Sequence, residues 1–408
     1  MIYVTRPNRF VLVCAFAAAA CIALLATSRA AAQVPSEEPS LIAHEWGTFT
    51  SIAGANGEAI DWLPLTASVD SPGFVHRDLL PLPGLPGFVY HSKKHLKFGL
   101  RGTIRMETPV LYFYTSRDLT LSVHVSFTKG LITEWYPSAS EVTPTEEVTG
   151  DTLYKRAANG ILSWDSVMLE PHSTAGFPRD AADSRYYPAR ETSSTPLRVT
   201  TALGAEHEKF LFYRGVSTAP AAIAARARED GGVAVTSLKE EIPGVILFER
   251  RGPRAGFRVG AATRTETVLD PPDLTDSLDS LSRKIEAMLV DHGLFRDEAQ
   301  AMLHTWGDSW FEEGSRLIYI VPAPYVSAIL PLTIHPAPQQ TVRVFVGRME
   351  IISPATVQAV EDAISSRDAP TVGKYCRFLE PIRQKISEKS PGLVEQGQAD
   401  GFLYGVCQ

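Results

Sequence analysis

The residues best suited to chemistry lie in one segment of the C-terminal third, around His304, Asp308, Glu312 and Glu313. A helix turns by about 100° per residue, so His304, Asp308 and Glu312 would follow one another along one helical face. One imidazole with several carboxylates suits a metal site or a proton relay. Tryptophans lie on the opposite side, which predicts an amphipathic helix. The polar face would then be solvent-exposed, unless it looks across a cleft at another part of the chain.

A second candidate is the pair His44–Glu45, near the expected start of the ordered chain. A histidine beside a carboxylate can ligate a metal or exchange protons. In a strand, however, neighbouring side chains point to opposite faces, so the two could serve one site only if a bulge turned them together. A structural role is the simpler interpretation.

Other signals for chemistry are weak. His91 and His95 have the spacing of a zinc-ligand pair on a helical turn, but a site would need a third ligand, and two lysines lie between them. HExxH, Walker, GxGxxG and GxSxG motifs are absent from the sequence. All six tryptophans have an acidic residue within two positions, a composition found in sugar-binding clefts. On strands, however, adjacent Trp and acidic residues diverge, which favours a core role.

The secondary structure predicted around these residues changes along the chain, from mainly strands to a mixture of helices and strands. Residues 41–269 are predicted to form a β-rich body, because short runs such as Leu119–Phe127 alternate apolar with mostly polar residues. Asn56-Gly57 and Asn159-Gly160 predict hairpin turns, within Thr48–Asp61 and Leu153–Val167. Residues 270–408 are predicted to be mixed, with helices over 278–293, 296–313, 353–365 and 371–387 and strands between them. The fold class expected is β-rich α+β, a sandwich-like antiparallel body followed by a helix-bearing C-terminal part.

The first 32 residues are predicted to be a signal peptide that directs export to the periplasm or the extracellular space. Arg6 and Arg9 precede a long apolar run, and small residues end at Ala32 as a cleavage site. A retained membrane anchor is the alternative. Residues 33–40 are expected to form a disordered leader, and no later stretch is apolar and long enough to span a membrane.

Cleavage would change both the charge and the cysteine count. The basic residues would fall from 39 to 36 against 46 acidic ones, a formal charge of −10. This acidity argues against nucleic acid or anionic lipid as a partner. Only Cys376 and Cys407 would remain, and outside the cytosol an even pair is expected to form a disulfide, with two buried thiols as the alternative.

Three phrases of the sequence resemble those of a family of exported bacterial proteins. They are His44–Thr50, Arg105–Tyr114 and Asp308–Gly314. The family has no assigned activity, so the resemblance implies export and implies no site residue or cofactor.

Two hypotheses about function follow from the sequence. We favour a ligand-binding or structural protein that works outside the cytoplasm, whose partner is a small molecule, a glycan or a component of the cell envelope. The alternative is an exported hydrolase, with or without a metal, in which residues of the 304–313 segment meet His44 or Glu45 across a cleft. The sequence does not decide between them, because fold analogy alone cannot establish a reaction.

Overall fold

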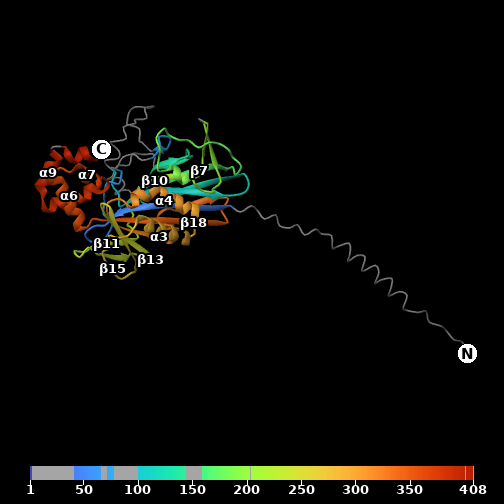
Figure 1. Ribbon diagram of the computed structural model, residues 1–408. Helices are drawn as coiled ribbons and strands as arrows, with labels where there is room; N and C mark the ends of the chain where they lie inside the picture. The colour runs from blue at the N-terminus through green and yellow to red at the C-terminus, as the bar shows by residue number, and fades with distance from the viewer. Residues whose placement is uncertain are drawn as a thin grey trace. The chain divides into compact units, whose positions relative to one another are not determined.

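The computed structural model describes Met1 and residues 41–65, 71–77, 100–143, 159–202, 204–399 and 401–407. The described part is mixed, with large sheets that are antiparallel except for one strand pair and a helical C-terminal region (Figure 1). The β-rich α+β class expected from the sequence is confirmed. No helix in these ranges has both the length and the apolar character that a bilayer crossing requires.

A nine-stranded sheet forms the centre of this part of the chain. All its neighbouring strands are antiparallel except the central pair β1 and β18, which run parallel in the register Glu45–Arg343 and Thr50–Arg348. This pair joins the start of the described chain to its C-terminal third. In sheet order the strands are β14 (Arg254–Ala262), β13 (Ile242–Arg251), β16 (Gly314–Ile320), β18 (Gln340–Ile351), β1 (Ile42–Ile52), β3 (Ile104–Tyr114), β10 (Leu211–Ser217), β5 (Gly130–Tyr136) and β2 (His76–Arg77).

A second sheet of six strands packs against the large one, and apolar residues of both interleave in one core. This is the sandwich-like arrangement predicted from the alternating pattern of the β-rich body. The six strands are β17 (Leu332–His335), β4 (Leu119–Phe127), β7 (Gly160–Leu169), β8 (Leu197–Thr201) and β9 (Gly204–Glu208), with β6 (Glu141–Thr143) paired to β7. A small third sheet contains β11 (Ile223–Ala227), β12 (Val233–Ser237) and β15 (Thr267–Leu269).

Helices cover the other face of the nine-stranded sheet and form a separate cluster at the C-terminal end (Figure 1). Ser277 and Ser353 begin two of them, each accepting a hydrogen bond from a backbone N–H three residues on, as expected for N-caps. The helices are α3 (Leu278–Asp291), α4 (Arg296–Trp310), α5 (Ala323–Ile329), α6 (Pro354–Ser366), α7 (Ala369–Gly373), α8 (Leu379–Lys389), α9 (Pro391–Ala399) and α10 (Phe402–Val406), with 3-10 turns η1 (Tyr187–Arg190) and η2 (Cys376–Phe378). The sulfur atoms of Cys376 and Cys407 lie 2.00 Å apart and form the expected disulfide within this cluster.

The two Asn-Gly turns have different outcomes. Gly57 has a φ of +89°, and an antiparallel bridge joins Ala53 to Ala59, so the chain reverses there as predicted. Asn159-Gly160 does not form the predicted turn, because neither residue has a positive φ. The Asn159 side chain instead accepts a hydrogen bond from the Lys129 N–H at 3.0 Å. The rest of the predicted hairpin, residues 151–158, lies outside the described ranges.

Gly347 lies on the same face of β18 as Arg343. The aromatic ring of Tyr319, from the neighbouring strand β16, covers this glycine. Tyr319 is the register partner of Gly347. A Cβ on Gly347 would lie 2.2 Å from Cζ of the Tyr319 ring, so only glycine leaves room for it. The ring therefore fixes the end of β16 just before the chain turns into α5.

We expect Gly347→Ala to destabilise the protein by about 1–3 kcal/mol, because the buried Tyr319 ring must move to admit the new methyl group. Urea unfolding followed by circular dichroism would measure the change. Gly176→Ala is the matched control, since a Cβ there would meet no atom within 4 Å. Equal stability of the two variants would contradict this packing argument.

Candidate functional site

The polar face of α4 does not gather into one site. His304 and Asp308 are solvent-exposed and pair with Glu191 at 3.4 Å and Arg185 at 3.0 Å. Glu312 lies beyond the end of α4, where the chain turns inward, and its carboxylate pairs with Arg348. The helical row expected from the spacing is therefore divided between solvent and protein interior.

Glu313 makes a structural contact. Its carboxylate accepts the backbone N–H of Gly252 at 3.0 and 3.1 Å, which ties the end of α4 to the turn between β13 and β14. Gly252 has a φ of +60°, so this turn uses the left-handed conformation that glycine tolerates best.

His44 and Glu45 point to opposite faces of the sheet, as the strand geometry predicts. The His44 ring nitrogen Nδ1 lies 2.8 Å from Glu298 at the start of α4, and both residues are buried. Glu298 also accepts the Tyr114 hydroxyl at 2.7 Å and the Phe295 N–H at 2.7 Å. β1 does meet α4, but through a glutamate that the sequence analysis did not select. Its position three residues after the N-cap Phe295 was the available signal.

No group of three or more His, Cys, Asp or Glu side chains within the described ranges is placed to hold a metal ion. His91 and His95 lie outside those ranges. Five of the six tryptophans are completely buried, and Trp135 is partly buried, so their rings are core residues. Their burial removes the stacking surface that a sugar-binding cleft would need.

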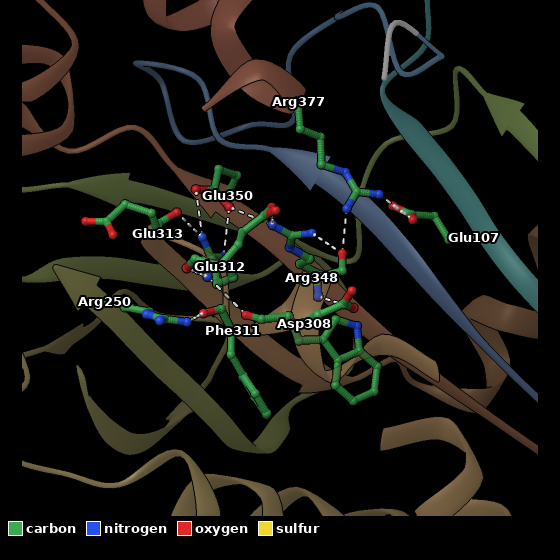
Figure 2. Close-up of polar contacts among 12 residues, drawn as sticks. Glu107, Arg250, Asp308, Phe311, Glu312, Glu313, Arg348, Glu350 and Arg377 are labelled. Carbon is green, nitrogen blue, oxygen red and sulfur yellow. Dashed lines mark hydrogen bonds and ion pairs between the residues drawn. The ribbon is translucent and has the colours of Figure 1, made fainter. Parts of the chain in front are cut away.

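A row of buried charges crosses the helix-covered face of the large sheet (Figure 2). Arg316 donates to Glu350 at 2.9 Å, and Arg348 reaches both Glu350, at 3.4 Å, and Glu312. Arg377 of η2 pairs with Glu107 of β3. We call these residues, together with Arg105, the ionic row. It lies between the apolar cluster under α3 and α4 and the apolar cluster of the C-terminal helices.

The charges of the ionic row determine its protonation. Burial alone would raise the pKa of Glu107, but the guanidinium groups of Arg377 and Arg105 lower it from 4.5 to about 2. Burial also opposes the ionisation of Glu312, and Arg348 with its neighbouring arginines lowers the pKa of this carboxyl below its ordinary value. Carboxylates held ionised in this way cannot act as proton donors near neutral pH. The ionic row therefore joins elements of the structure and does not form a proton relay.

A better candidate for binding lies near the start of β18, where an ion pair on the opposite face of the sheet borders two hollows. Glu45 has no solvent exposure, and its carboxylate accepts the Tyr213 hydroxyl and, at 2.6 Å, Nε of Arg343. Burial alone would lower the pKa of Arg343. The charge of Glu45 and the nearby Tyr213 outweigh burial and raise this pKa above its ordinary value, so the guanidinium stays charged. Its Nη2 atom is buried and has no partner in hydrogen-bonding geometry.

Arg343 lines two open hollows, one on each side of α5. The Met288 hollow, of about 480 Å³, lies between β13, β14, α3 and the start of α5. The Pro331 hollow, of about 500 Å³, lies between the end of α5, β17 and the start of β18. Volumes of about 300–1,000 Å³ are typical of small-molecule sites. Sequence analysis missed this arrangement, although an arginine inside an apolar strand was a visible signal.

Comparisons with known proteins do not indicate a function for this chain. No sequence-family model matches the chain, and no curated protein is similar to it. Among solved structures, the chain is similar to the Mu homology domain of Fcho1 from Danio rerio with bound Eps15 peptide. The identity is 7%, the match covers 77% of this chain and 96% of that one, and the TM-score is 0.27. A likeness this weak carries no argument.

We expect Glu107→Gln to lose roughly 3 kcal/mol of stability at pH 7, because it removes an ionised carboxylate that the arginines stabilise. The folded pKa of about 2 lies below the ordinary 4.5, so this contribution is complete above pH 4.5 and is lost as the pH falls toward 2. Urea unfolding of wild type and variant should show a difference at pH 3 that is less than half of that at pH 7.

Glu266→Gln provides the control, since Glu266 forms a half-exposed pair with Arg226. This substitution should lower the free energy of unfolding by less than about 1 kcal/mol at either pH. A Glu107→Gln effect that is equally large at both pH values would contradict the assigned ionisation.

Proposed function

We propose that this chain is an exported ligand-binding protein and that its binding site is formed by the hollows on either side of α5. The observation that supports binding is Arg343, whose charged guanidinium is anchored through Nε by the buried Glu45 and whose side chain lines both hollows. An anchored arginine loses less conformational entropy when it binds a ligand than a free one does. Export is supported by the pattern of residues 1–32.

The hydrolase alternative has less support. Glu312 is paired with Arg348, and His304 and Asp308 are exposed. The partners of His44 and Glu45 are Glu298 and Arg343, so the predicted acid–base pair does not form. The described residues also contain no cluster suited to a metal. We therefore do not propose a reaction.

A thermal-shift screen of small metabolites tests the binding proposal. A ligand present at about 100 times its Kd should stabilise the protein by roughly 2.7 kcal/mol, which gives a rise in Tm of several degrees. Ala323→Trp should abolish the shift caused by a ligand in the Met288 hollow, because Ala323 is exposed and lines that hollow. Ser327→Trp should do the same for a ligand in the Pro331 hollow, which the exposed Ser327 lines. Ala328→Trp is the matched control, since this exposed residue of the same helix lines neither hollow.

A shift in both Ala323→Trp and Ser327→Trp that is as large as in Ala328→Trp would place binding elsewhere and contradict the proposed site. A screen without any hit would contradict the binding role.

Intact-mass spectrometry of the protein after cell fractionation tests export. We expect the extracytoplasmic fraction to contain a chain that begins at Gln33. Replacing Ala30 and Ala32 with Asp should block cleavage, because the peptidase requires small residues at these positions. A cytoplasmic pool that retains Met1 would contradict export and would leave the binding site untouched.

A further inference from the structure

The Met288 hollow combines an apolar wall with a few cationic groups. Apolar side chains from four elements line it, among them Ile242, Val259, Met288 and Ile320. Val259 is 48% exposed, an unusual exposure for a large apolar side chain in this protein. An apolar wall that stays open to solvent suits a ligand with an apolar body, because burying that body releases water from both surfaces.

The cations of the hollow give it a preference for negative charge. Arg343 lies at the border with the second hollow, and Lys284 contributes an ammonium group from an exposed position on α3. Glu241 is the single carboxylate among the lining residues. Because Arg343 is already neutralised in part by Glu45, the site favours an anion of low charge.

Backbone donors for a more highly charged anion are few at the start of α5. Pro322 is the N-cap of α5, the helix that borders the hollow, and Pro324 lies in its first turn; neither proline has a backbone N–H. Phosphate sites commonly use several backbone N–H groups at a helix start or in a glycine-rich loop. A carboxylate, in contrast, fits the planar fork of a single guanidinium.

We infer that the Met288 hollow binds a small amphipathic monocarboxylate, with its apolar body against Met288 and Val259 and its carboxylate toward Arg343. This inference deepens the proposed binding function and rests on it.

Isothermal titration calorimetry of the purified protein with four probes tests the ligand class. Octanoate has the apolar body and the carboxylate, acetate has only the carboxylate, octanol has only the body, and octyl phosphate carries a phosphate head on the same body. Octanoate should bind at least tenfold more tightly than each of the other three.

Variants then locate the carboxylate. Arg343→Lys keeps the charge opposite Glu45, so the fold is retained, but it removes the planar fork and should weaken octanoate binding roughly tenfold. Lys284→Ala should weaken it a few-fold, because this ammonium is more exposed. Lys239→Ala, an exposed lysine that does not line the hollow, should leave the affinity unchanged. Melting temperatures of the variants would verify that they are folded.

The possible outcomes distinguish the class of ligand from the location of the binding site. Tighter binding of octyl phosphate or octanol that Ala323→Trp abolishes would overturn the carboxylate class and keep the binding site. Octanoate binding that is insensitive to both Ala323→Trp and Arg343→Lys would overturn the assigned position. Absence of binding by all four probes would overturn the inference, and it would leave the wider metabolite screen to decide the binding function.

Discussion

Glu45 is a carboxylate without solvent access in the middle of a nine-stranded sheet, and its charge determines what must lie beside it. A buried charge without a partner costs several kcal/mol. The partner is Arg343, its register neighbour on the parallel strand β18. A slip of one residue would carry Arg343 to the other face, so this pair supports one register between strands that are almost 300 residues apart in sequence. It also leaves a fixed guanidinium at the edge of two hollows.

Charges on the other face of the same strands act differently. The ionic row connects β3, β16, β18 and η2 and separates two apolar clusters. Buried ion pairs often contribute little net stability compared with apolar side chains, but breaking one is costly. Such a row favours one arrangement of the C-terminal helices on the sheet, because other arrangements would leave arginines unpaired. One face of the central strand β18 therefore carries the ionic row. The other face packs in the sandwich core, and only Arg343, near the start of the strand, borders the two hollows.

Local patterns in the sequence predicted most of the elements and few of the contacts. The alternation in 119–127 and the helix predicted over 353–365 depend on neighbours in sequence, and the structure confirms both. The pairing of β1 with β18 depends on residues far apart, so periodicity could not reveal it. For the same reason Glu298 and Arg343 were missed as partners of His44 and Glu45. The spacing of His304, Asp308 and Glu312 was correct for a helix, but α4 ends at Trp310, before the third residue.

The most direct test of the account is a crystal structure of the protein with 4-bromobenzoate, in which anomalous scattering locates the bromine atom. The account predicts a bromine peak beside Met288 and Val259, with the carboxylate of the probe within hydrogen-bonding distance of Arg343. A probe bound elsewhere, or an Arg343 turned away from the hollow with Glu45 still as its partner, would contradict the claim that this arginine was placed to receive a ligand.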